Sequence, residues 1–343
     1  MSADVFDDAL LDDEQALARF DATLRHLAES GARVRVAAES AREAWASLPG
    51  QQQPRAIVAA GADARLLRAV LEPWCPVPFV AWPGPSLPGW AGALDLVVVL
   101  APGGGDSGIA SVVTEAVRRG CSLVIACPER SVLAEHATSR DTTLLPTQSD
   151  DALAVAVVML QALHHLGLGP EVNAESVAAA LDDVAVECSP YHDLANNPAK
   201  ELAIVLADAL PLVWGGTVLA ARAARRVAEA LRRSSGRAAL AADADHLLPV
   251  ISAVAKRDPF ADPFADDEDE RRPALVILDD GWDQPSVREQ RGRLQAAAEQ
   301  SGVRTQMVPG SEGPEVARYA SLLATGTYAA TYLSVGLAGR GDR

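Results

Sequence analysis

The sequence is poor in aromatic residues, in cysteine and in long apolar runs, and each shortage excludes a class of protein. Of 343 residues, 4% are aromatic and four are cysteines without a C-x-x-C pair, which excludes a disulfide scaffold and a cysteine zinc site. No apolar run reaches the 18 residues of a membrane-spanning helix. The first residues carry several aspartates and no basic residue, unlike a secretory signal. We therefore expect a cytoplasmic protein with reduced thiols.

Basic residues are also in deficit. Lysine and arginine number 30 against 46 aspartates and glutamates, for a formal net charge of −16. Nucleic acids and anionic membranes are bound by a basic face, so neither is an expected partner. Hydrophobic residues make up 49% of the chain, which is enough for packed cores. A local basic pocket for a small phosphate ligand remains compatible with this charge.

Short apolar runs that alternate with helical patterns indicate an α/β fold in two lobes. Continuous apolar strands separated by helices are typical of a parallel sheet covered by helices on both faces. The expected strands are 56–60, 77–82, 94–100, 122–127, 211–214, 273–279 and 303–308. The expected helices are 63–71, 106–119, 131–136, 150–166, 200–208, 217–233, 286–300 and 314–337.

The same pattern predicts the domain boundaries. These are an N-terminal helical segment over 1–30, a first lobe over 31–168, a linker over 169–198 and a second lobe over 199–343. Within the second lobe, 257–272 holds a repeated DPFA and a run of five acidic residues. A block with so much charge cannot bury enough surface to become ordered, so we expect a mobile acidic loop.

Ligands of parallel sheets bind where strands end and helices begin, and three such junctions have a suitable composition, although the third, Gly61-Ala62-Asp63, has one glycine and supports little beyond a tight turn. The first holds Gly103, Gly104 and Gly105, followed by Asp106 and Ser107. Its glycines allow backbone N–H groups to surround an anion, although the Asp106 carboxylate would repel a phosphate. A flexible capped turn is the alternative.

The second junction is Gly215-Gly216-Thr217, which has the same order of strand, turn and helix and contains no acid. A small structural turn is again the alternative. None of the junctions matches a dinucleotide-binding or Walker motif, so we expect no nucleotide cofactor and no other cofactor.

Among the histidines, His246 is the best catalytic candidate. It lies in the segment Ala244–Leu247, which we expect to be a loop near the ligand side, and the neighbouring Asp245 would raise its pKa. A helix-capping role is the alternative. The other histidines show no metal-ligand spacing, and we expect no metal site. The Asp279–Asp283 segment is a turn or, alternatively, a magnesium site.

The order of these segments resembles the SIS (sugar isomerase) domain proteins, and more closely the bifunctional phosphoglucose/phosphomannose isomerases. The stretches that carry the resemblance are 77–95 (VPFVAWPGPSLPGWAGALD), 96–127, 197–226 with its PLVWG run, and the closing helix with Tyr332-Leu333. The resemblance implies two SIS-like lobes, a sugar phosphate ligand and isomerisation between an aldose and a ketose. It also implies a homodimer, because the family completes each site with a histidine of the neighbouring subunit.

The departures from this family concern its chemistry. Ala101, Gly103 and Asp106 stand where the family's phosphate turn has hydroxyl residues, and Pro146-Thr147 stands where it has Pro-Arg. The segment that carries the family's proton-shuttling glutamate aligns near Ser234-Ser235-Gly236, which holds no carboxylate. Glu229, five residues earlier, is a candidate replacement. The sequence ends at Arg343, before the expected position of the family's late lysine.

Three hypotheses follow. The chain binds a phosphosugar with its isomerase activity weakened or lost; or it is an active isomerase of mannose 6-phosphate or glucose 6-phosphate that uses His246 with Glu229 or Asp245; or it is an interaction protein that uses its acidic segments. Isomerisation needs a base that moves a proton between adjacent carbons, and loss of that base costs about 10²–10⁴-fold in rate.

Overall fold

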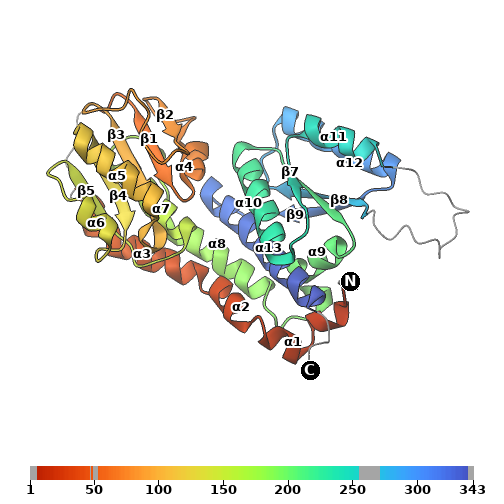
Figure 1. The fold of residues 1–343 in the computed structure, drawn as a ribbon. Helices are drawn as coiled ribbons and strands as arrows, with labels where there is room; N and C mark the ends of the chain where they lie inside the picture. The colour runs from red at the N-terminus through yellow and green to blue at the C-terminus, as the bar shows by residue number, and fades with distance from the viewer. Residues whose placement is uncertain (1–5, 47, 49–52, 255–270, 339–343) are drawn as a thin grey trace, which may run out of the picture. The chain divides into compact units, whose positions relative to one another are not determined.

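A computed structural model describes residues 6–46, 48, 53–254 and 271–338. The chain divides into two compact units (Figure 1). The first-sheet unit is Ser30–Ala179, and the second-sheet unit combines Met1–Glu29 with Ala180–Arg343. The division falls within helix α8 (Ala174–Glu187), which lies in the segment expected as a linker. The sequence-based domain boundaries stay predictions.

The first-sheet unit contains a five-stranded parallel sheet in the order β2-β1-β3-β4-β5. Its central strand β3 is the fully buried LVVVL run, because both of its faces are covered. The strands are β1 (Ile57–Gly61), β2 (Phe79–Ala81), β3 (Leu96–Leu100), β4 (Ser122–Cys127) and β5 (Thr142–Pro146).

Helices cover the two faces of this sheet. Alternate strand residues such as Val97 and Val99 pack on Val112 and Val113 of α5 in one core cluster. The strand residues between them point to the opposite face of the sheet. On that face α7 contacts β3 and β4, and α7 is itself packed on α3. The helices of the unit are α3 (Ser30–Ala46), α4 (Ala64–Leu71), α5 (Ser107–Arg119), α6 (Val132–His136) and α7 (Ala152–His165).

The second-sheet unit contains a four-stranded parallel sheet in the order β7-β6-β8-β9. One core cluster joins Leu212 and Trp214 of β6 to Leu247 of α11 and Leu294 of α12. The strands are β6 (Leu210–Gly215), β7 (Leu240–Ala241), β8 (Pro273–Asp279) and β9 (Arg304–Pro309).

Helices α10 and α13 pack closely on each other in this unit. Gly326 of α13 allows this approach, because a Cβ atom there would collide with the side chain of Val227 on α10. The helices are η1 (Asp8–Leu11), α1 (Glu14–Ala18), α2 (Asp21–Ala28), η3 (Leu194–Asn196), α9 (Pro198–Leu206), α10 (Val218–Ser235), α11 (Ala244–Ser252), α12 (Pro285–Ser301) and α13 (Glu315–Leu337).

The predicted fold class, α/β with two lobes built on parallel sheets, is confirmed. The two short strands β5 and β7 were not expected, because neither is a continuous buried apolar run. In the described part of the chain, no helix combines the length and apolar character needed to cross a membrane. The predicted acidic loop lies outside the described residues, apart from Arg271 and Arg272.

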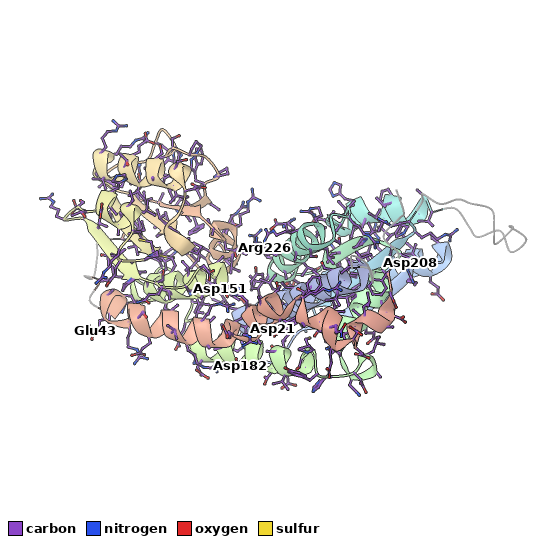
Figure 2. All side chains as sticks on the ribbon, turned by 60° about the horizontal axis from the view of Figure 1, so that its bottom comes forward. Asp21, Glu43, Asp151, Asp182, Asp208 and Arg226 are labelled. Carbon is purple, nitrogen blue, oxygen red and sulfur yellow. The ribbon has the colours of Figure 1, made fainter. Side chains whose placement is uncertain are left out.

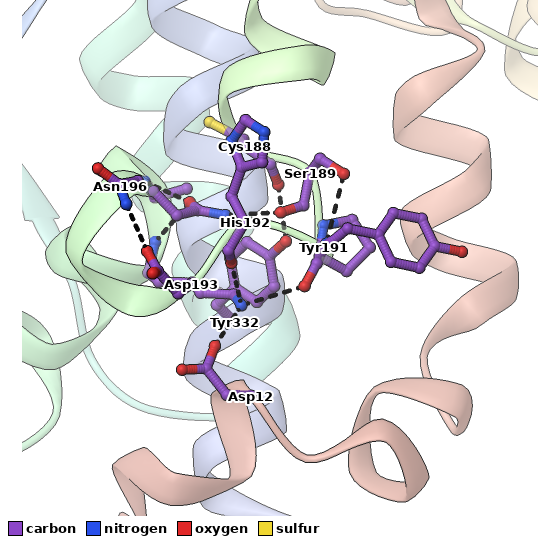
Figure 3. A network of polar contacts seen from close by, with 12 residues as sticks. Asp12, Cys188, Ser189, Tyr191, His192, Asp193, Asn196 and Tyr332 are labelled. Atoms are coloured by element: carbon purple, nitrogen blue, oxygen red, sulfur yellow. Dashed lines mark hydrogen bonds and ion pairs between the residues drawn. The ribbon is translucent and has the colours of Figure 1, made fainter.

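Within the second-sheet unit, a buried lysine joins the N-terminal segment to α9; Figure 3 labels Asp12, His192 and Tyr332 around it. The side chain of Lys200 on α9 is 0% exposed, and its Nζ donates to Asp12 at 2.7 Å and to the carbonyls of His192 at 2.7 Å and Pro190 at 3.2 Å. The ammonium also lies 5.5 Å from the ring centre of Tyr332, a geometry that stabilises a cation. All three protons of the ammonium are therefore used within the fold.

Replacing Lys200 with methionine keeps the length of the side chain and leaves two carbonyls and Asp12 without their donor. Asp12 itself is half-exposed, so the loss comes mainly from the hydrogen bonds of the buried ammonium. Hydrogen bonds to a charged group contribute about 1.5–3 kcal/mol, so we expect Lys200→Met to lower the free energy of unfolding by about 3 kcal/mol. Urea unfolding followed by circular dichroism measures this loss. Arg233→Met, at an exposed position of α10, is the control, and equal losses in both variants would contradict a structural role for Lys200.

Burial also controls the reactivity of the thiols, all four of which are free. Desolvation raises the pKa of Cys188 to about 12, so almost no thiolate is present at pH 8. Cys75 is half-buried, and burial raises its pKa as well. We expect iodoacetamide at pH 8 to alkylate Cys75 in the folded protein and Cys188 after unfolding, as read by peptide mass spectrometry. Equal rates in the folded protein would show that Cys188 is accessible.

Candidate functional site

Apart from Glu229, the candidate residues lie where parallel strands end and helices begin, one group in each unit. The carboxyl ends of parallel strands share one edge of the sheet, and the helices that follow begin there with unpaired backbone N–H groups. In the first-sheet unit this edge includes the turn between β3 and α5. In the second-sheet unit it includes the turn between β6 and α10 and the turn that follows β8.

The turn before α5 contains the three predicted glycines in left-handed conformations. The φ angles of Gly103, Gly104 and Gly105 are 68°, 97° and 73°, values that residues other than glycine rarely adopt. Asp106 then caps α5, because its Oδ1 accepts the backbone N–H of Ile109 at 2.9 Å. Ser107 is the first residue of the helix and is exposed. The turn thus combines a positive helix end with a fixed carboxylate.

The first-sheet unit lacks a cation at the position where the resemblance implies an arginine. Thr147 follows β5 there; it is completely buried and its backbone N–H donates to the carbonyl of Cys127 at 3.1 Å. The Thr147 hydroxyl has no hydrogen-bond partner among the described residues. A short buried side chain cannot replace an exposed guanidinium as a phosphate ligand.

The glycines of the second turn serve close packing. A Cβ atom on Gly215 would collide with the carbonyl of Ala220 in α10, and one on Gly216 would collide with Val287 of α12. Thr217 caps α10, because its hydroxyl accepts the backbone N–H of Ala220 at 3.1 Å. The same hydroxyl donates its proton to Asp280, so its donor is already used within the protein.

Asp280, which only the structure links to this turn, organises the second edge. The residue is 9% exposed, and its carboxylate also accepts the backbone N–H of Trp282 at 3.3 Å. Arg318, from the first turn of α13, donates to the carbonyl of Asp280 at 2.9 Å and lies 5.6 Å from the ring centre of Trp282. The acidic DDGWD segment was visible in the sequence as a turn or magnesium site, but nothing there pointed to Thr217 or Arg318 as neighbours.

His246 lies in the first turn of α11 and not in a loop, which corrects the predicted placement. Its side chain is exposed, and α11 follows β7, so the residue lies near the same edge of the sheet as Thr217. The neighbouring Asp245 pairs with Arg293 of α12 at 3.3 Å. The carboxylate that was expected to act on His246 is therefore shared with an arginine.

Glu229 lies far along α10 from the turn. Eleven residues separate it from Val218, the start of the helix, which corresponds to about 16 Å at 1.5 Å per residue. Its carboxylate accepts a hydrogen bond from Arg226, labelled in Figure 2, at 2.8 Å. The Ser234–Gly236 segment forms the end of the same helix, where Gly236 adopts a left-handed φ of 67°. The structure thus separates Glu229 from the Gly215–Thr217 turn.

Across the residues that the structure describes, no group of three or more histidine, cysteine, aspartate or glutamate side chains could hold a metal ion. The chemistry that the two edges offer is therefore that of helix N-termini, a carboxylate beside each turn, and the arginine–tryptophan pair beside Asp280.

Residues 195–338 match the family model of the bacterial phospho-glucose isomerase C-terminal SIS domain. No curated protein matches the chain in sequence. Among solved structures, a glucose-6-phosphate isomerase like protein from Thermus thermophilus is 18% identical, with a TM-score of 0.53 and coverage of 95% of this chain and 92% of that one.

Two further structures share the fold. The C-terminal domain of glucosamine-fructose-6-phosphate aminotransferase from Francisella tularensis is 10% identical, with a TM-score of 0.64 and coverage of 93% and 97%. A phosphosugar isomerase structure from Silicibacter pomeroyi is 15% identical, with a TM-score of 0.60 and coverage of 91% and 96%. The chain therefore shares the fold of these structures, and its C-terminal part is similar to the SIS domain of bacterial phospho-glucose isomerases.

Proposed function

We propose that this protein binds a sugar phosphate and that its isomerase activity is lost or strongly weakened. The chemical class of the ligand is supported by the C-terminal part of the chain, which matches a domain of phospho-glucose isomerases. The proposal includes the predicted homodimer and a cytoplasmic location. Isomerisation between mannose 6-phosphate or glucose 6-phosphate and fructose 6-phosphate by an active enzyme is the competing function.

The turn Gly103–Ser107 supports the binding of a phosphate group. It precedes α5, a helix of 13 residues, whose N-terminus attracts an anion through its free backbone N–H groups and its dipole. Gly103, Gly104 and Gly105 add no side chains of their own over this backbone, and Gly103 and Gly105 are exposed. The Gly215–Thr217 turn offers the N-terminus of α10 in the same way.

One observation supports weak binding: a carboxylate already occupies each helix N-terminus. Asp106 lies at the start of α5, and Asp280 contacts Thr217 at the start of α10. Two unit charges about 4 Å apart repel each other by about 4 kcal/mol at an effective dielectric constant of 20. Each turn is thus partly neutralised from within, and a phosphate there loses much of the attraction.

The arrangement of the acids also supports a loss of isomerase activity. A general base must lie within hydrogen-bond reach of the proton that it removes, and the candidate bases here are carboxylates. Asp280 is engaged by Thr217 and by the backbone of Trp282, and Glu229 is engaged by Arg226. His246 is exposed near the same sheet edge, and this position is the feature that favours the competing function, in which His246 opens the sugar ring.

The first experiment is a coupled assay for the conversion of glucose 6-phosphate or mannose 6-phosphate to fructose 6-phosphate. We expect turnover at least 10²-fold below that of a phosphoglucose isomerase that has its glutamate, because the base is not in place. Turnover at a normal rate that His246→Ala abolishes, with unchanged melting temperature, would establish the competing function. Low turnover would support the loss of isomerase activity, and the binding of a sugar phosphate would then need its own test.

The second experiment asks whether Asp106 weakens phosphate binding. Serine caps helices as well as aspartate does, so Asp106→Ser keeps the cap, removes the negative charge and supplies a hydroxyl. We expect the dissociation constant for fructose 6-phosphate, measured by calorimetry, to fall by tenfold or more.

The matched control is Asp13→Ser. Asp13 caps α1 through an equivalent hydrogen bond from Ala16 at 2.8 Å and lies outside both turns. It should leave the dissociation constant unchanged. If fructose 6-phosphate fails to raise the melting temperature of either the native protein or Asp106→Ser, the protein does not bind sugar phosphates, and the interaction hypothesis is favoured.

A further inference from the structure

The second sheet ends at a strand that is paired on one side only. Its order is β7-β6-β8-β9, so within the described part of the chain β9 (Arg304–Pro309) pairs with β8 alone. In the first sheet the fourth strand, β4, lies between β3 and β5. The two sheets arrange their first four strands alike, and the second unit continues from β9 directly to α13. Among the described residues, nothing pairs with β9 where β5 pairs with β4 in the first sheet.

The direction of the backbone groups of β9 follows from its pairing with β8. The N–H of Gly310 donates to the carbonyl of Asp279 at 2.7 Å, so it points toward β8. Successive residues of a strand direct their N–H and C=O groups to opposite sides. Thr305 and Met307 therefore direct theirs away from β8. Pro309 occupies a third outward position and has no N–H to leave unpaired, as is typical of an edge strand.

The side chains at this edge are exposed and almost free of charge. Thr305, Met307 and Pro309 are exposed, and Met307 is exposed by 40%. The one charged residue of the strand, Arg304, lies at its amino end and pairs with Asp208. Edge strands usually prevent pairing with another chain through charged residues, proline or a bulge. Residues 305–308 contain no charged residue and no proline, so this part of the edge is a template for a further strand.

A second copy of β9 matches this edge. Two identical strands related by a two-fold axis within one sheet are antiparallel, and opposite residues of the hydrogen-bonded type exchange two bonds. With Gln306 on the axis, Thr305 of one copy lies opposite Met307 of the other. The two pairs of this kind use all the outward N–H groups of both residues in both copies. The exposed Met307 side chain also gains a neighbour on the same face.

Charge favours this pairing over that of a charged peptide. The chain has a formal net charge of −16, so two copies repel each other over most of their surface. Residues 305–308 offer no counter-charge to a charged peptide, and they bring no like charges together in a pair of copies. The two Arg304 residues would lie four positions apart along the strand, about 13 Å at 3.3 Å per residue. That separation exceeds the screening length of about 10 Å at 0.1 M salt.

We propose that β9 is a self-association surface, on which the β9 strands of two copies pair antiparallel and join their four-stranded sheets into one continuous sheet. The proposal assigns a surface to the homodimer, and it rests on that part of the proposed function alone. Sugar phosphate binding has no role in it, so every measurement is made without ligand.

Sedimentation velocity of the full chain measures the association. We expect a dimer at micromolar concentration. Met307→Pro removes one outward N–H and keeps every bond to β8, and Met307→Lys places a charge on the edge. We expect each to raise the dissociation constant of the dimer at least tenfold. Leu240→Lys is the matched control, because Leu240 is also 40% exposed and lies on β7 at the other edge of the same sheet, and it should leave the dimer unchanged.

Two double variants distinguish lost pairing from misfolding. One carries Thr305→Lys with Met307→Lys, and the other carries Thr305→Glu with Met307→Glu. Each places like charges opposite each other in a pair of identical copies, so each should be monomeric by itself. An equal mixture should form a heterodimer, because every lysine then lies opposite a glutamate.

A cysteine on the axis tests the register. Opposite residues of the type that is not hydrogen-bonded have Cα atoms about 4.5 Å apart, within the range of a disulfide. Gln306→Cys should therefore give a disulfide-linked dimer after oxidation, seen by electrophoresis without reductant. Leu240→Cys should give none, and the unchanged protein controls for the four native thiols.

Three outcomes overturn the proposal. They are a monomer at about 100 μM, a dimer that Met307→Lys and Leu240→Lys affect equally, and no cross-link in Gln306→Cys. The first also removes the homodimer from the proposed function and leaves the edge to an extended peptide of another protein. The second keeps the homodimer and excludes β9 as its surface. Sugar phosphate binding is unaffected by either result.

Discussion

Parallel pairing of strands is the constraint on which the rest of this structure depends. A parallel sheet needs a crossover between successive strands, and helical crossovers cover both of its faces. In each unit the buried runs, such as LVVVL in β3, form the centre, and the helices bury their apolar sides on it. The same geometry brings helix N-termini together at the carboxyl edge of each sheet, which is where both candidate turns lie.

In both units a carboxylate binds at the helix N-terminus on that edge. Asp106 binds the backbone at the start of α5, and Asp280 binds the hydroxyl of Thr217, which caps α10. A carboxylate beside a helix N-terminus stabilises the helix through its dipole. It also uses the positive potential that a phosphate would otherwise meet. The features that strengthen the fold at these turns are therefore the ones that weaken them as anion sites.

The interior of the second-sheet unit contains a buried positive charge. Lys200 is buried with all its protons donated, one of them to Asp12 from the N-terminal segment, so a charged contact joins residues far apart in the sequence. This arrangement is complete within the protein.

Several features followed from local sequence. β4 and β8 were predicted to the residue, because a continuous apolar run of six or seven residues between polar ones is characteristic of a buried parallel strand. The glycine turns were recognised for a related reason, since glycine is the residue that accepts positive φ at Gly103–Gly105. The short strands β5 and β7 were missed, because partly exposed edge strands carry no such run.

The sequence by itself determined the fold class, the strand-to-helix junctions and the resemblance to SIS-domain isomerases, because these depend on periodicity and on the order of neighbouring residues. The tertiary structure alone decided which distant residues meet: Thr217 with Asp280, Arg318 with Trp282, and Asp245 with Arg293. Such contacts depend on how strands pair and helices cross. Local patterns do not encode those distances, so whether a carboxylate is a free base or a structural acceptor emerged only from the folded chain.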